Sequence, residues 1–142
     1  MNTYLLTSTS ITIHAALSKV WDALVNPDAI KQYLPGTSVV STWREGSPIV
    51  WKGEWQGRTY ADKGVILSLK PGRLLEYSYF SPLSGLADKL QNYGTVSLKL
   101  SGLDNLTYVS LVQDNHLTEQ ARAHAQKIWE MMLAALKNYL EA

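Results

Sequence analysis

The C-terminal stretch, residues 118–142, carries the longest helical pattern of hydrophobic positions in the chain. Polar side chains such as Lys127 and Glu130 fall on one face of this pattern. The opposite, apolar face consists of Ala121, Ala125, Ile128, Trp129, Met132, Leu133, Leu136, Tyr139 and Leu140. This spacing predicts an amphipathic helix long enough to cross a small domain. Thr118 is the expected N-cap, and Glu119 follows in the first turn, where the helix dipole favours an anion.

Two shorter helical segments are expected near the N-terminus. Helical spacing of apolar residues covers 16–25, with Ser18 as a candidate N-cap. Asn26-Pro27 should end this helix, because the residue before a proline is driven out of the helical region. Pro27 can itself begin a second short helical segment over 28–33.

The rest of the chain alternates apolar and polar residues, which predicts short strands. A first strand is expected around Ile11 and Ile13. Further strands are expected over 39–43, 49–56, 58–69, 74–80, 96–100 and 107–111, with a loop over 81–92. The order of strand, two helices, antiparallel meander and long helix predicts an α+β fold, in which a curved antiparallel sheet wraps around the C-terminal helix. The length of 142 residues favours one domain spanning the chain.

The central pair of strands should form a hairpin around Gln56-Gly57. In that register Trp55 faces Arg58, Gly53 faces Tyr60, and Trp51 faces Asp62. The ring of Tyr60 would then cover the bare backbone at Gly53.

Beyond Gly64 the alternation changes phase, and the apolar positions become Val65, Leu67 and Leu69. A bulge at Gly64 would keep the apolar side chains on one face of the sheet. We therefore expect the bulge at that glycine.

Composition narrows the classes of function. Hydrophobic residues make up 46% of the chain, which excludes a disordered protein. The net charge is +1 with no basic face, so no nucleic-acid partner is expected. The chain has no cysteine, and therefore no disulfide and no thiolate metal site. Residues 1–10 lack the pattern of a signal peptide, and no apolar run could span a bilayer, so we expect a soluble cytoplasmic protein.

Several segments resemble a known family. The run over 11–24 resembles the opening of START-like (SRPBCC, birch-pollen-allergen-like) domains. The segments that resemble the branch named for the activator of heat shock protein 90 ATPase are 51–57, Tyr60, Asp62, 64–67, Pro71, Leu74, 79–85, Trp129, Leu133, 136–137 and 140–141. The resemblance implies the helix-grip fold, with a cavity between the sheet and the C-terminal helix. The superfamily includes lipid carriers, hormone receptors, polyketide cyclases and chaperone co-factors, so the resemblance implies no single activity.

Large aromatic residues are the first candidates for a ligand-binding site. The set consists of Trp51, Trp55, Tyr60, Tyr77, Tyr79 and Trp129, with Met132 on the same face of the helix as Trp129. These rings could simply fill the core. They are, however, hard to pack without gaps in so small a domain. We therefore expect them to line a pocket, in which hydroxyl and indole groups orient a ligand.

Arg122 lies seven residues before Trp129 and so falls on the apolar face of the predicted helix. The arginine could lay its stem on apolar surface and reach water or Asp114. Alternatively, it could stand at the mouth of the cavity and bind an anionic head group. The sequence leaves both alternatives open.

Candidate catalytic and metal-binding residues carry less weight. Among the acids, Asp62 is best placed, but Lys63 and Arg58 are close enough to pair with it, so a surface ion pair is expected. The remaining candidates for acid–base chemistry are Glu54, Glu76, Tyr60 and Tyr77. The histidines His14, His116 and His124 lack the spacing of a metal site. We therefore expect no metal and no other cofactor, and we assign no catalytic residue.

Three functions follow from these observations. The first is binding of a small hydrophobic or amphipathic molecule in the cavity. The second is a chaperone-associated module, which an exposed apolar patch on the convex side of the sheet would favour. The resemblance implies that co-chaperones of this branch carry an additional docking region, and nothing in this sequence corresponds to it. The third is a cyclase-like enzyme, which would require a carboxylate or a tyrosine inside the cavity.

Overall fold

The computed structural model describes residues 5–55 and 57–142, apart from the side chains of Trp55 and Arg58. The strands are β1 (Thr7–Ile13), β2 (Ser38–Ser41), β3 (Pro48–Trp55), β4 (Arg58–Lys70), β5 (Leu74–Tyr79), β6 (Gly94–Leu103) and β7 (Leu106–Gln113). The α-helices are α1 (Leu17–Val25), α2 (Pro27–Tyr33) and α3 (Glu119–Glu141), and two 3₁₀ turns are η1 (Pro82–Ser84) and η2 (Leu90–Asn92).

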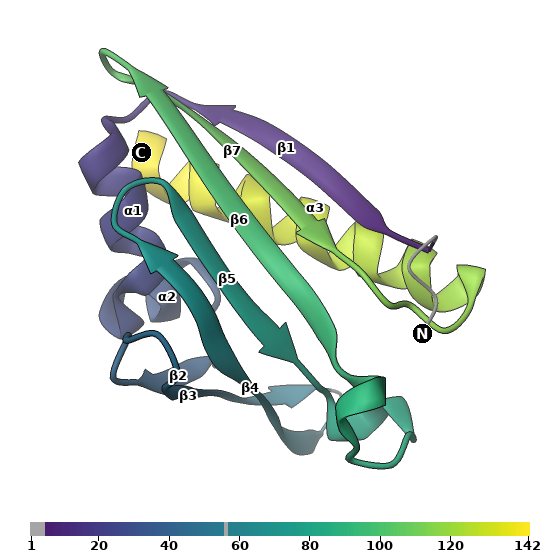
Figure 1. The fold of residues 1–142 in the computed structure, drawn as a ribbon. Coiled ribbons are helices and arrows are strands. Elements are labelled where there is room, and N and C mark those ends of the chain that lie inside the picture. Colours follow the sequence, from purple (N-terminus) through teal and green to yellow (C-terminus); the bar gives the residue numbers. More distant parts are fainter. Residues whose placement is uncertain (1–4, 56) are drawn as a thin grey trace.

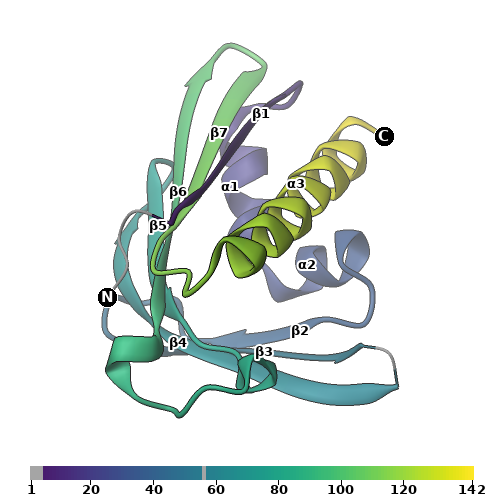
Figure 2. The same ribbon diagram turned by 90° about the vertical axis from the view of Figure 1, so that its right-hand side faces the viewer.

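The strands form one antiparallel sheet in the order β1-β7-β6-β5-β4-β3-β2. The sheet bends strongly, so that β2 and β3 lie across the lower end of the longer strands (Figure 1). Seen from the side, α3 lies along the concave face, and α1 and α2 stand beside it (Figure 2). The predicted α+β fold, with a curved sheet around the C-terminal helix and two short helices after the first strand, is confirmed.

The long helix begins as the sequence predicts. The hydroxyl of Thr118 accepts a hydrogen bond from the Ala121 amide at 3.0 Å, and so satisfies one of the free N–H groups of the first turn. Leu133 and Leu136 are fully buried against the sheet and the short helices. The apolar face of α3 therefore closes the core.

The first short helix begins earlier than the polar pattern indicated. The N-cap of α1 is Ala16, whose carbonyl accepts hydrogen bonds from Lys19 and Val20. Ser18 lies inside the first turn, so its assignment as N-cap was wrong. The cap of α2 is Asn26, whose side chain accepts from the Asp28 amide at 2.9 Å.

The hairpin of β3 and β4 has the predicted register. Gly53 pairs with Tyr60, and Trp51 pairs with Asp62. The Tyr60 ring covers the backbone of Gly53 so closely that a Cβ atom there would lie 2.6 Å from the phenol oxygen. The predicted covering of the glycine is confirmed.

The predicted bulge at Gly64 is wrong. The β3–β4 register continues without a shift through Gly64, and the irregularity lies between Ile66 and Ser68, where β4 meets β5. Val65 and Leu67 are consequently exposed. A Cβ atom on Gly64 would lie 1.6 Å from the Ser78 carbonyl oxygen, so glycine is needed there for the close approach of β5.

Within residues 5–55 and 57–142, no helix combines the length and the apolar character needed to cross a lipid bilayer. The hydrophobic core lies between the sheet and the three α-helices and contains residues from both. Its fully buried apolar side chains are Ile13, Val20, Ile49, Ile66, Val96, Val109, Leu111, Leu133 and Leu136.

Candidate ligand-binding pocket

A pocket of about 410 Å³ lies between the concave face of the sheet, α2 and α3. Its volume falls within the range of small-molecule sites, roughly 300–1,000 Å³. The strands contribute aromatic rings, and α3 contributes Trp129, Met132 and Ala135. Exposed side chains of Ile128 and Met131 also belong to its wall.

Most of the residues proposed from the sequence meet in this pocket. Those that line it are Trp51, Tyr60, Tyr77, Tyr79, Trp129 and Met132. The side chain of Trp55 lies outside the part of the structure that is described. Arg122 is not among the lining residues. The grouping follows from the alternation of strands, but ligand binding by these residues stays a prediction.

The rings pack against one another on one wall. The Trp51 ring centre lies 4.9 Å from that of Tyr77 and 5.4 Å from that of Tyr79, in tilted arrangements. Burial raises the pKa of both tyrosines above the ordinary value, so their phenols stay protonated and can donate hydrogen bonds. The wall therefore combines apolar area with fixed polar groups.

Trp129 is held by a residue that the sequence did not single out. Its indole Nε1 donates a hydrogen bond to Gln113 Oε1 at 2.6 Å. Gln113 ends β7, so the bond joins the helix to the sheet at the edge of the pocket. No local pattern marks this glutamine, because the contact depends on how α3 crosses the sheet.

Asp62 overturns an expectation from the sequence. A surface ion pair was expected, but the side chain is only 8% exposed and lines the pocket. Neighbouring residues of a strand point to opposite faces, so Lys63 turns outward and pairs with Asp88 instead. Tyr60 and Asp62 are two residues apart on β4, so both side chains point to the pocket face, and Trp51, the cross-strand partner of Asp62, points to the same face. The burial of Asp62 could therefore have been predicted from the hairpin register.

The carboxylate of Asp62 is only partly satisfied. The Tyr79 hydroxyl donates a hydrogen bond to Oδ2 at 2.5 Å. The buried Oδ1 has no hydrogen-bond partner among the described residues. Burial raises the pKa of Asp62, although the hydroxyls of Tyr79 and Ser81 partly oppose this; the Ser81 hydroxyl makes no hydrogen bond of normal geometry to Oδ1. The pocket thus contains both a carboxylate and tyrosines, either of which would meet the requirement stated for a cyclase-like enzyme.

Arg122 also differs from expectation, because it neither contacts Asp114 nor lines the pocket. Its Nη2 lies 2.7 Å from Glu119 Oε1, one helical turn earlier in α3. Asp114 Oδ1 instead accepts a hydrogen bond from the Thr95 amide at 2.7 Å. Of the partners considered for Arg122, Asp114 is therefore not the one that it takes, since the nearer carboxylate on the same helix already pairs with the guanidinium.

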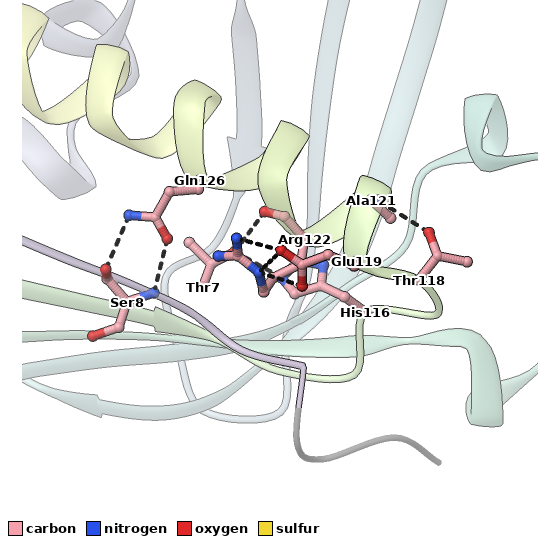
Figure 3. A network of polar contacts seen from close by, with 8 residues as sticks. All are labelled: Thr7, Ser8, His116, Thr118, Glu119, Ala121, Arg122 and Gln126. Carbon is pink, nitrogen blue, oxygen red and sulfur yellow. Dashed lines mark hydrogen bonds and ion pairs between the residues drawn. The ribbon is translucent and has the colours of Figure 1, made fainter.

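Figure 3 shows this region, which we call the β1–α3 network: Thr7, Ser8, His116, Thr118, Glu119, Arg122 and Gln126. The hydroxyl of Thr7 and Nε2 of His116, both buried, share a hydrogen bond of 2.8 Å. Gln126 exchanges two hydrogen bonds with the backbone of Ser8. The network attaches the start of α3 to the edge strand. Across the described residues, no three His, Cys, Asp or Glu side chains are grouped to hold a metal ion.

Comparison with solved structures supports this architecture. The solution structure of ChR145 from Cytophaga hutchinsonii is 48% identical in sequence with a TM-score of 0.85, over 99% of this chain and 97% of that one. The solution structure of the Aha1 dimer from Colwellia psychrerythraea is 22% identical with a TM-score of 0.75, over 96% of each chain. The crystal structure of Ara h 8.0201 is 13% identical with a TM-score of 0.74, over 95% of this chain and 96% of that one. The last two likenesses show the fold alone.

No curated protein matches the sequence. A family model described as "Activator of Hsp90 ATPase homolog 1-like protein" matches residues 14–141, which is nearly the whole chain. The chain therefore belongs to the activator of Hsp90 ATPase homolog 1-like family, a branch of the START-like (SRPBCC) superfamily.

Proposed function

We propose that the chain binds a small, mainly apolar molecule in the pocket between the sheet and α3. The observation that carries this proposal is the pocket itself, about 410 Å³ of space lined by tryptophan, tyrosine and aliphatic side chains. Protein interiors are normally packed without voids of this size. A space large enough for a small molecule, walled by rings, is better explained as a binding site than as a defect of the core.

The wall of the pocket formed by α3 suits this function. Met132 can adjust its flexible thioether to ligands of different shape. Ile128 and Met131 are 47% and 67% exposed, although both belong to the wall. They would contribute apolar contacts at the opening when a ligand enters from solvent.

Two neighbouring alanines of α3 allow a matched test. Ala135 lines the pocket, whereas Ala134 is exposed. A hydrophobic fluorescent probe should bind the native protein saturably. Ala135→Phe should fill part of the space and weaken binding by about tenfold or more, the consequence of losing roughly 1.4 kcal/mol. Ala134→Phe adds the same ring outside the pocket and should leave the affinity unchanged.

Two results would count against pocket binding. Equal binding by both phenylalanine variants and the parent protein would place the probe elsewhere on the surface. Probe fluorescence that rises only as the protein unfolds would report a loosened core.

A second candidate function is a chaperone-associated module, which the description of the family suggests. Val65 and Leu67, exposed on β4, are apolar groups that a partner protein could cover. The outer positions of β5, the strand next to β4, however, include Glu76 and Ser78, so the exposed apolar area is narrow. The test is the ATPase rate of purified Hsp90 with and without the chain. Strong stimulation, lost in Val65→Ser, would rank this function first.

A further inference from the structure

We infer that Asp62 selects ligands carrying a positively charged amine, held between its carboxylate and the aromatic wall of the pocket. This inference rests on the proposed binding function and adds the chemical class of the ligand. The charge of this ligand is opposite to that of the anionic head group that the position of Arg122 suggested. Arg122 lies outside the pocket, whereas the carboxylate of Asp62 lies inside it.

The distribution of charge is the first step of the argument. Among the described residues that line the pocket, Asp62 is the only acidic side chain, and none is lysine, arginine or histidine. Lys63, its neighbour in sequence, is paired with Asp88 on the other side of the strand. Arg122 is paired with Glu119 in the β1–α3 network. A buried carboxylate without a cation is costly, and a cationic ligand would supply the missing charge.

Hydrogen bonding is the second step. Oδ2 of Asp62 already accepts a hydrogen bond from the Tyr79 hydroxyl, whereas no described residue, Ser81 included, donates one of normal geometry to Oδ1. An ionised carboxylate only accepts hydrogen bonds, so its free oxygen needs a donor. An ammonium group offers three donors and no acceptor, which matches this requirement. Rotation about the Cβ–Cγ bond of aspartate is soft, so either oxygen can turn toward a ligand.

The rings beside Asp62 are the third step. Trp51 is the cross-strand partner of Asp62, and its ring contacts those of Tyr77 and Tyr79. Aromatic faces attract cations because the ring carries negative charge above and below its plane. An organic ammonium ion would therefore be stabilised both by the ion pair with the carboxylate and by contact with the faces of the rings. A neutral alcohol could satisfy Oδ1 but would leave the charge uncompensated, and a ligand carboxylate would be repelled.

Three probes of equal length separate these possibilities: phenylbutylamine, phenylbutanol and phenylbutyrate. Each shares the ring and the chain, and they differ in carrying an ammonium, a hydroxyl or a carboxylate group. Near neutral pH, titration calorimetry should show the amine binding about tenfold or more tightly than the alcohol, as expected for hydrogen bonds to a charged group. The carboxylate should bind most weakly.

Asp62→Asn tests the residue, because it removes the charge and keeps the shape. The amine should lose its advantage over the alcohol, so that the ratio of the two dissociation constants falls to about one, as expected when the charged partner is lost. Asp88→Asn removes the same charge from an exposed residue that lines no part of this pocket, and should leave the ratio unchanged. Tyr79→Phe frees Oδ2 and should increase the preference for the amine. If Asp62→Asn does not fold, this variant and the ranking of the three probes on the unmodified chain still test whether Asp62 selects amines.

The outcomes separate this inference from the function on which it rests. If no probe binds the unmodified chain, binding in the pocket fails, and the role of Asp62 fails with it. If all three probes bind equally well, the pocket function stands and selection by Asp62 is overturned. An amine preference that persists in Asp62→Asn also overturns it.

Discussion

Near the start of α3, the buried side chains of Thr7 and His116 form a hydrogen bond with each other. The buried carboxylate of Asp62, in the pocket farther along the helix, has one oxygen for which the described part of the chain offers no partner. Both sites lie between the same helix and the same sheet. The first joins elements distant in sequence through complete hydrogen bonds (Figure 3). The second combines empty volume with an unmet polar group.

The difference separates the residues that hold the fold from the residues available to a ligand. A complete buried network rigidifies the elements that it joins. A buried oxygen without a partner reduces stability unless something else supplies the hydrogen bond. Departures from full satisfaction are expected at functional sites, which supports the pocket, rather than the β1–α3 network, as the place of binding.

The largest effect on stability is expected from a substitution in β4, the strand that carries Asp62. Gly64→Ala places a methyl group against the Ser78 backbone carbonyl, which cannot move without distorting β5, and should cost about 3 kcal/mol of unfolding free energy. Gly53→Ala meets only the tip of the Tyr60 ring, which can rotate, and should cost about 1 kcal/mol. Urea denaturation measures both. Equal losses would mean that the close approach of β5 is not what requires glycine at position 64.

The next effect is expected in the β1–α3 network. Thr7→Val keeps the shape of a fully buried side chain but leaves His116 Nε2 without its partner, so stability should fall by about 1–3 kcal/mol. Thr12→Val makes the same change at an exposed position of β1 and should change stability by less than about 0.5 kcal/mol. If the two variants unfold at the same urea concentration, the network does not stabilise the fold.

A smaller effect should appear on acidification. Burial, and next the charge of Arg122, lower the pKa of His116 below its ordinary value, while Asp114 partly opposes them. The unfolded chain therefore binds the proton more readily, and stability should decrease as the pH falls below about 6.5, by at most about 1.4 kcal/mol per pH unit. The slope should disappear in His116→Gln. A slope of the same size in both proteins would assign the pH dependence to other groups.

The smallest effect should have the opposite sign and distinguishes the two sites most sharply. Burial raises the pKa of Asp62, so its contribution to stability is lost as the pH rises above the ordinary value of about 3.9. Asp62→Asn should therefore raise stability at neutral pH, by less than about 1 kcal/mol, and give no gain in acid. Asp88→Asn removes an exposed, ion-paired carboxylate and should give no such gain. A loss of stability in Asp62→Asn would make that carboxylate part of the scaffold.

Local patterns in the sequence predicted much of the scaffold. Helical periodicity identified α3, and a threonine followed by an acidic first turn located its N-cap. The glycine at the hairpin turn fixed the pairing of Trp51 with Asp62, because a hairpin register follows from its turn. The grouping of Tyr60, Tyr77, Tyr79 and Trp129 could be anticipated for the same reason: strand and helix periods decide which face a side chain takes.

Contacts between distant segments were decided only by the tertiary structure. Gly64 is needed for the close approach of the Ser78 backbone, and the bulge lies further along β4, between Ile66 and Ser68. Arg122 is satisfied by Glu119, so it neither meets Asp114 nor reaches the pocket. Asp62 is buried on the face where the neighbouring strand β5 places Tyr79 beside it, although its charge alone had favoured the surface. Periodicity assigns a side chain to a face of its own element, but the packing of elements against one another decides whether that face meets solvent, core or an open pocket.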